Sequence, residues 1–114
     1  MEDTLRERIQ GIIDSNDVVL FMKGTKHFPQ CGFSATVVEV LKRVGVDFHT
    51  FNILADPSVR QGMKEFTNWP TFPQLYVKGE FIGGCDIVRD MYTSGELQPI
   101  LQKALAPEAS AESN

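Results

Sequence analysis

The stretch FPQCGFSATVVEVL, residues 28–41, places a cysteine directly before a predicted helix. Apolar residues then recur at helical spacing, which is typical of one buried stripe: Phe33, Val37, Val40, Leu41 and Val44. A second cysteine three residues after Cys31 would complete a Cys-x-x-Cys redox pair, but the chain has Ser34 there. The stretch therefore predicts a cysteine at a helix N-terminus that carries half of a redox motif.

The residues before this stretch predict a helix and a strand. Thr4 and Glu7 have the spacing of a capping box, and an amphipathic helix is expected over residues 4–15. VVLFM (18–22) is apolar throughout, as in a buried central strand. KGTKHFPQ (23–30) contains Gly and Pro and predicts a loop. The cysteine thus follows a helix, a strand and a loop.

The second half of the chain predicts a strand, a helix, a hairpin and two more helices. FHTFNI (48–53) is rich in aromatic and β-branched residues, which favours a strand. Asp56 and Pro57 are typical of an N-cap and a first helical position. Further segments follow in order: a hairpin of QLYV (74–77) and EFIG (80–83) around Lys78-Gly79, a helix capped by Asp86, and a helix ending near Leu105. The predicted fold class is α/β, with a parallel pair followed by an antiparallel hairpin in one sheet.

Composition limits the function classes. The chain has 114 residues, 42% hydrophobic and 23% charged, as expected of one globular domain. Its net charge of -4 and the lack of a basic run argue against nucleic-acid binding. The longest apolar run has five residues, too few to cross a membrane. The charged start MEDTLRERIQ predicts a cytoplasmic protein, and the two cysteines, Cys31 and Cys85, are expected to be thiols.

Four motifs together resemble the monothiol glutaredoxins of the CGFS class: FMKGT, CGFS, NWPTFPQLYV and GGCD. The resemblance covers about residues 4–105. It implies a thioredoxin-like fold with a four-stranded mixed sheet flanked by helices, in a domain over residues 1–106. Residues 107–114 lack large apolar side chains and are expected to be a disordered tail. The family's usual proline after KGT is replaced here by Lys26-His27, which leaves the course of this loop open.

Cys31 is the candidate catalytic and metal-binding residue. Free N–H groups and the positive end of a helix dipole favour a thiolate, the form that attacks disulfides or binds metal. The alternative is a buried structural cysteine. Ser34 cannot supply the second thiol that releases a mixed disulfide, so a poor general disulfide reductase is expected. Ser34 could otherwise be a plain first-turn helix residue.

Two cations are candidates for the glycine carboxylate of glutathione. The resemblance implies this role for Lys23, at the end of the first strand, and Arg60, on the third helix. Cations at a pocket mouth can bind a carboxylate through charge-assisted hydrogen bonds. Lys64 lies one turn from Arg60 on the same helix face and could assist. The alternative is that all three are solvated surface charges.

Two further segments complete the glutathione site that the resemblance implies. Thr71-Phe72-Pro73 resembles a Thr-x-cis-Pro segment, in which Phe72 pairs its backbone with the cysteinyl unit like an added strand. The backbone at Cys85, with backbone and side chain of Asp86, would hold the γ-glutamyl end. The alternatives are a core Phe72 with an ordinary turn proline, a buried small residue at Cys85, and simple helix capping by Asp86.

A [2Fe–2S] cluster takes four thiolates. Cys31 and one glutathione supply two, so a homodimer with two of each would complete the set. The resemblance implies that such a dimer carries the cluster from scaffold to acceptor proteins and pairs with BolA-like partners. A glutathione-dependent oxidoreductase that reduces protein–glutathione mixed disulfides would use the same residues. A thioredoxin-fold adaptor, for which Cys31 is dispensable, is a third possibility.

Overall fold

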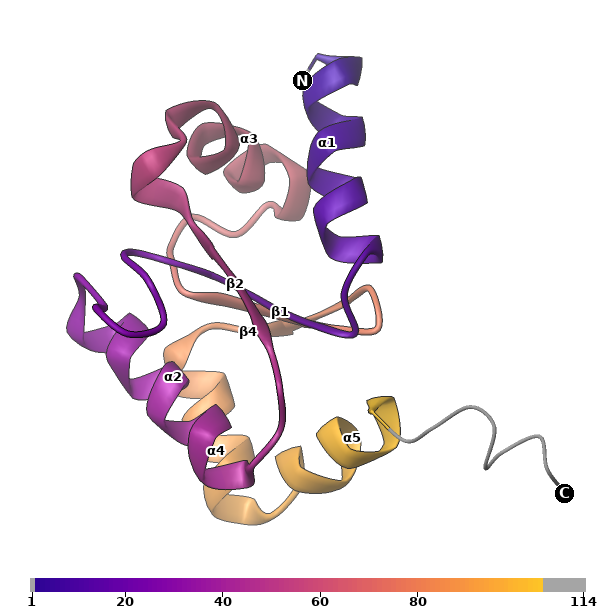
Figure 1. Cartoon of the computed structure of the whole chain (residues 1–114). Helices are drawn as coiled ribbons and strands as arrows, with labels where there is room; N and C mark the ends of the chain where they lie inside the picture. The colour runs from indigo at the N-terminus through magenta and orange to yellow at the C-terminus, as the bar shows by residue number, and fades with distance from the viewer. Residues whose placement is uncertain (1, 106–114) are drawn as a thin grey trace, which may run out of the picture.

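The computed structural model describes residues 2–105, in which a sheet lies between two groups of helices (Figure 1). The four strands are β1 (Val18–Met22), β2 (His49–Asn52), β3 (Gln74–Val77) and β4 (Glu80–Gly83). The helices are α1 (Asp3–Asp14), α2 (Gly32–Val44), α3 (Pro57–Thr67), α4 (Cys85–Ser94) and α5 (Leu97–Ala104). The predicted element order and fold class are confirmed, whereas the predicted tail over 107–114 lies outside the described residues.

The sheet has the order β2-β1-β3-β4. Strand β1 pairs parallel with β2 and antiparallel with β3, and β3 pairs antiparallel with β4. All five residues of β1 are buried because the strand is central and covered on both faces. This central position explains why the sequence of the strand, VVLFM, is apolar at every residue.

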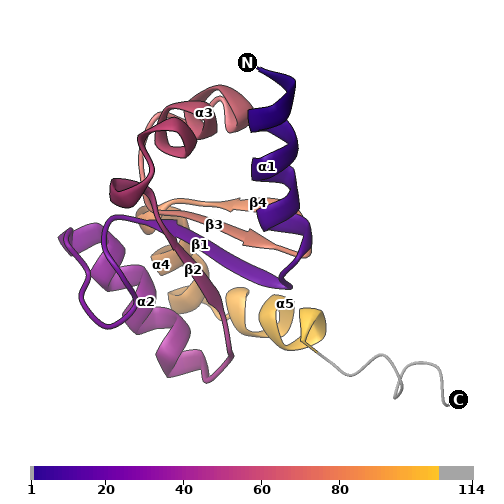
Figure 2. The ribbon, with the colours of Figure 1, turned by 45° about the horizontal axis from the view of Figure 1, so that its top comes forward.

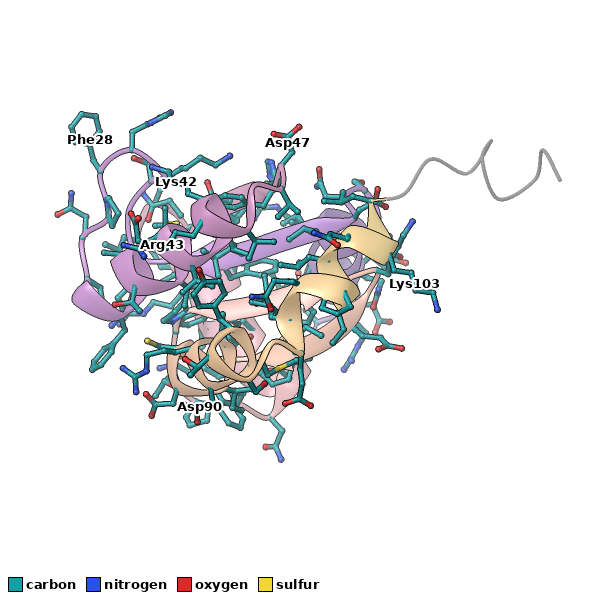
Figure 3. All side chains as sticks on the ribbon, turned by 90° about the horizontal axis from the view of Figure 1, so that it is seen from below. Phe28, Lys42, Arg43, Asp47, Asp90 and Lys103 are labelled. Atoms are coloured by element: carbon teal, nitrogen blue, oxygen red, sulfur yellow. The ribbon has the colours of Figure 1, made fainter. Side chains whose placement is uncertain are left out.

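Helices α1 and α3 cover one face of the sheet and α2, α4 and α5 cover the other (Figure 2). The side chains of β1 alternate between the two cores beneath these helices. Leu20 belongs to the core under α2, α4 and α5, while Phe21 belongs to the core under α1 and α3. Burial of each apolar side chain of this size stabilises the folded state by about 1.5–3 kcal/mol. Figure 3 views the first of these two faces from below, with Lys42 and Arg43 on α2, Asp90 on α4 and Lys103 on α5. Packing in the two cores holds the end of β1, the starts of α2 and α4, and helix α3 around one pocket.

Helix ends follow the predicted signals in part. Asp56 caps α3 as predicted, accepting a hydrogen bond from the Val59 N–H at 3.1 Å, and Gly45 ends α2 with φ +84°. The predicted capping box is wrong: α1 begins at Asp3, so Thr4 lies inside the helix and Glu2 at the N-cap makes no side-chain capping bond. A capping box needs its first residue outside the helix.

The second strand is shorter than predicted. It covers His49–Asn52, and Ile53–Ala55 form a 3₁₀ turn instead of continuing the strand. The reason is the Asn52 side chain, whose Oδ1 accepts hydrogen bonds from the N–H groups of Leu54 (3.0 Å) and Gly24 (2.9 Å).

Within residues 2–105, no helix combines the length and hydrophobicity that a membrane crossing requires.

Candidate functional site

A pocket of about 620 Å³ lies where five segments of the chain converge. Its lining comes from the end of β1, the start of α2, helix α3, the 69–73 segment and the start of α4. All the residues that the sequence singled out lie around it: Lys23, Cys31, Arg60, Lys64, Phe72, Cys85 and Asp86. The structure thus brings together groups that are up to 63 residues apart in the chain, from Lys23 to Asp86.

Cys31 occupies the N-cap position of α2 with extended backbone and is partly exposed. The backbone N–H of Ser34 is the main cause that lowers the pKa of this thiol. The Phe33 N–H, the Lys23 charge and the Ser34 hydroxyl act in the same direction, while burial opposes them. A thiolate at this position is therefore favoured, as the helix N-terminus predicts.

Ser34, which the sequence marked only as the replacement for a second thiol, also has a structural role in the site. Its side chain is fully buried, and its Oγ accepts a hydrogen bond from the Lys23 N–H at 3.1 Å. This bond ties the end of β1 to the first turn of α2. Because the oxygen accepts from Lys23, the hydroxyl proton is left to donate toward Cys31.

The loop between β1 and α2 is a small hairpin, which answers the question that Lys26-His27 left open. Thr25 and Phe28 exchange backbone hydrogen bonds of 3.2 and 3.1 Å, and the Gln30 N–H donates to the Lys23 carbonyl at 2.8 Å. Gly24 has φ +95°, and a Cβ there would lie 2.5 Å from the Gln30 nitrogen. The hairpin leads directly into Cys31, and Phe28 projects outward from it (Figure 3).

Lys26 holds the tip of this hairpin. Its Nζ donates a hydrogen bond to the Phe48 carbonyl at 2.7 Å and lies 4.1 Å from the centre of the Phe48 ring. Phe48 belongs to the core under α2. The lysine combines a hydrogen bond with a cation–π contact, so it anchors the loop.

The two α3 cations lie on the pocket side of that helix, opposite its contact with α1. Gly62, between Arg60 and Lys64, packs against α1 so closely that a Cβ there would lie 2.8 Å from Leu5 Cδ2. The Arg8 guanidinium of α1 pairs with the Asp56 carboxylate at 2.6 Å. Arg8 is the main cause that lowers the pKa of Asp56, and the Val59 N–H adds to it. Helix α1 thus fixes the position from which α3 presents its cations.

The Phe72–Pro73 peptide bond is cis, as predicted. The Phe72 side chain is buried in the core under α1 and α3, while the residue also lines the pocket. Within residues 2–105, its backbone N–H and C=O have no hydrogen-bond partner. An extended ligand could pair with these two groups.

Gln74 supports this segment and was not predicted. The fully buried side chain donates hydrogen bonds to the carbonyls of Trp69 (3.2 Å) and Thr71 (3.1 Å). Its Oε1 accepts from the Tyr76 hydroxyl at 3.1 Å, and burial raises the pKa of that tyrosine. Trp69 both lines the pocket and makes an edge-to-face contact with Phe81, with ring centres 5.4 Å apart.

The last segment of the site corrects one prediction. Asp86 does not cap α4: the N-cap is Gly84, and Asp86 lies in the first turn. Its Oδ1 instead accepts a hydrogen bond from Arg89 Nη2 at 3.2 Å. Cys85 is buried, and burial raises the pKa of its thiol, which the Arg89 charge partly opposes. The reactive thiol of this pocket is therefore Cys31.

Comparisons with known proteins agree with this geometry. The family model described as "Glutaredoxin" matches residues 18–82. The chain is 57% identical over 101 residues to "Monothiol glutaredoxin-S7, chloroplastic" of Oryza sativa subsp. japonica, covering 89% of this chain and 60% of that protein. It is 52% identical over 106 residues to "Uncharacterized monothiol glutaredoxin ycf64-like" of Synechocystis, covering 93% of this chain and 99% of that protein.

A solved structure is also similar. The solution structure of reduced poplar apo GrxS14 has 54% sequence identity and a TM-score of 0.78, over 90% of this chain and 94% of that one. The chain thus spans nearly the whole of the poplar and cyanobacterial chains but 60% of the rice protein.

Proposed function

Because this chain belongs to the glutaredoxin family, as a monothiol glutaredoxin, we propose that it binds glutathione beside Cys31 and shares a [2Fe–2S] cluster with a second copy of itself. The cluster is cargo that the dimer receives from scaffold proteins and transfers to acceptor proteins. BolA-like proteins are proposed as further partners.

The observation that carries the proposal is a single reactive thiol at the head of a pocket. Cys31 has a lowered pKa, and the position that could hold a resolving cysteine is filled by buried Ser34. An intramolecular Cys-x-x-Cys disulfide is therefore impossible, and the Cys31 thiolate stays available for another partner. Soft thiolate ligands are those that iron–sulfur clusters take.

The pocket also suits a bound glutathione. Lys23, Arg60 and Lys64 offer cations to one carboxylate of this anionic tripeptide. The unpartnered backbone groups of Phe72 suit its cysteinyl unit. Free N–H groups at the start of α4 suit the carboxylate at the γ-glutamyl end. Such a ligand would bring its own thiol next to Cys31.

One chain cannot hold the cluster with its described residues alone. Within residues 2–105, no group of three or more His, Cys, Asp and Glu side chains could hold a metal ion. A cluster on Cys31 would take three more thiolates from outside this chain. Two glutathiones and the partner's Cys31 supply that number, which is the reason for proposing a homodimer.

The lowered pKa of Cys31 also favours a second function, the reduction of protein–glutathione mixed disulfides. The Cys31 thiolate would attack the glutathione sulfur, forming a Cys31–glutathione disulfide and releasing the protein thiolate, which takes up a proton. A second glutathione thiolate would attack that disulfide, releasing oxidised glutathione and the Cys31 thiolate. The net reaction converts the mixed disulfide and one free glutathione into the protein thiol and oxidised glutathione, so one disulfide replaces another.

Anaerobic reconstitution with iron, sulfide and glutathione tests the proposal. Wild type should give a brown protein that elutes as a dimer. Cys31→Ser should abolish the visible absorption, whereas Cys85→Ser should keep most of it because Cys85 contributes mainly backbone. Equal loss in the two variants would show that Cys85 is a ligand and would contradict the four-thiolate count. A colourless wild type that turns over a glutathione mixed disulfide quickly would favour the second function.

A further inference from the structure

A buried glutamine stands behind one wall of the pocket. Gln74 is fully buried at the start of β3, and its backbone pairs with Phe21 of the central strand β1. Burying a side-chain amide costs free energy unless its polar atoms are hydrogen-bonded. An apolar side chain of this size would avoid that cost, so the hydrogen bonds of Gln74 indicate a role beyond packing.

The hydrogen bonds of Gln74 converge on the segment that lines the pocket. Its Nε2 donates to the carbonyls of Trp69 (3.2 Å) and Thr71 (3.1 Å). A side-chain amide nitrogen carries two hydrogens, so both donors are used. Trp69 and Thr71 both border the pocket. The strand-bound glutamine therefore holds the 69–73 segment from the protein side.

The orientation of this amide is fixed by a second residue of the same strand. Tyr76 lies two positions after Gln74, so the two side chains share one face of the sheet. The Tyr76 hydroxyl donates to Gln74 Oε1 at 3.1 Å, and the tyrosine belongs to the core under α1 and α3. The segment is also tied to the end of α3, because the Trp69 N–H donates to Thr67 Oγ1 at 3.1 Å.

The bond to the Thr71 carbonyl sets the direction of the Phe72 N–H. These two groups belong to one planar peptide unit, and in a trans peptide they point in opposite directions. The cis bond of the segment is the next one, between Phe72 and Pro73. Because Gln74 draws the carbonyl inward, the Phe72 N–H points away from Gln74, on the side of the pocket. In the part of the chain that the structure describes, this N–H has no partner.

We propose that Gln74 is a positioning residue: by holding the Thr71 carbonyl, it aligns the Phe72 N–H with the carbonyl of the ligand's cysteinyl unit. The pocket then prefers ligands that carry this carbonyl. This assignment rests on the proposed glutathione site. The Phe72 C=O belongs to the following peptide unit, which Gln74 does not contact, so the effect is confined to one hydrogen bond of the ligand.

Two thioether ligands test the assignment without redox chemistry. S-methylglutathione carries the cysteinyl carbonyl. Its analogue with an (E)-CH=CH unit in place of the Cys–Gly peptide bond keeps the extended shape but lacks that carbonyl. The analogue also lacks the glycine N–H, a loss that is the same for every variant of the protein. Affinities can be measured by isothermal titration calorimetry.

Three variants complete the design. Gln74→Met keeps the length of the side chain but removes both donors. Tyr76→Phe keeps Gln74 but removes the hydroxyl that fixes its amide, and it decides the question if Gln74→Met does not fold. The matched control is Gln98→Met on α5, where the glutamine Nε2 donates to the Tyr92 carbonyl at 3.3 Å.

Wild type should bind S-methylglutathione about three- to tenfold more tightly than the alkene analogue, the equivalent of one hydrogen bond. Gln74→Met should lose a similar factor for S-methylglutathione and keep its affinity for the analogue. Tyr76→Phe should show the same selective loss at a smaller size, and Gln98→Met should change neither affinity. The Phe72 amide resonance should shift when S-methylglutathione binds wild type, but not when it binds Gln74→Met.

Three results would overturn the assignment while leaving the glutathione site intact. The first is an equal loss of affinity for both ligands, which would indicate a structural role. The second is unchanged S-methylglutathione affinity in the folded variants of Gln74 and Tyr76. The third is equal binding of the two ligands by wild type. If wild type binds neither ligand, the proposed glutathione site fails and the assignment fails with it.

Discussion

The backbone N–H of Lys23, the residue that follows β1, donates a hydrogen bond to the Oγ of Ser34 in the first turn of α2 over 3.1 Å. The residue that stands where a second cysteine would complete the redox motif is thus part of the site. Its buried hydroxyl joins the strand end to the helix that carries Cys31. The same hydroxyl helps to lower the pKa of the Cys31 thiol.

Replacing Ser34 with alanine should raise the pKa of Cys31, because the thiolate loses one hydrogen-bond donor. The alkylation rate of Cys31 by iodoacetamide should therefore rise at higher pH than in wild type. Stability should fall by about 0.5–1.5 kcal/mol, the usual net value of one hydrogen bond, since the part-buried Lys23 N–H loses its acceptor. Ser58→Ala, at an exposed position of α3, is the control. An unchanged pH profile would mean that the hydroxyl does not act on the thiolate.

Arg8→Met should loosen the N-terminus of α3 through Asp56. The pKa of Asp56 is lowered mainly by Arg8, so the stabilisation is present above the ordinary value of 3.8 and is lost as pH falls through the lowered pKa. Because Arg8 is half exposed, the loss at neutral pH should be about 0.5–1 kcal/mol. Urea unfolding at neutral pH and near pH 2 measures it, and a difference that persists at the acid end would contradict this reading.

Lys26→Met should release the tip of the hairpin that precedes Cys31. The variant keeps the alkyl stem but loses the hydrogen bond to the Phe48 carbonyl and the cation–π contact with its ring, together about 1–2 kcal/mol. The amides of Thr25 and Phe28 should then exchange with deuterium faster. Lys42→Met, on the outer face of α2, should leave them unchanged (Figure 3). Equal exchange in both variants would show that the backbone bonds suffice to hold the loop.

The sequence was most informative where one signal acts locally. The buried run of β1 and the Asp56-Pro57 helix start depend on neighbouring residues, and both were predicted correctly. Asp86 was misplaced by two residues relative to the helix start, because Gly84 takes the N-cap. The two readings of Phe72 proved compatible, since its side chain is in the core and its backbone borders the pocket.

Other features depend on contacts that no local pattern encodes. Ser34 meets Lys23 only once α2 has folded back onto the end of β1. Lys26 meets Phe48 across 22 residues. Gln74 could have drawn attention as a polar residue entering a strand, but its partners lie in the preceding turn. The roles of these residues become visible only in the folded structure. Each residue supports a segment that borders the pocket or leads into it.

Arg60→Glu should raise the glutathione concentration needed for cluster reconstitution. The substitution removes a charge-assisted hydrogen bond, which costs roughly 1.5–3 kcal/mol per site, and adds repulsion toward the glycine carboxylate. Arg60→Ala should therefore have a smaller effect, and Lys103→Glu, with the same charge change on α5, should have none. The measurement is cluster absorbance against glutathione concentration. An unchanged requirement in Arg60→Glu would remove Arg60 from the site.

The central claim is that glutathione is a structural ligand of a cluster shared by two chains. The most direct test is anaerobic reconstitution with dithiothreitol alone and then with glutathione, followed by sizing and measurement of iron, sulfide, protein and bound glutathione. The account predicts little or unstable cluster with dithiothreitol, and a dimer with two glutathiones per cluster once glutathione is added. A stable cluster formed without any low-molecular-weight thiol would contradict it.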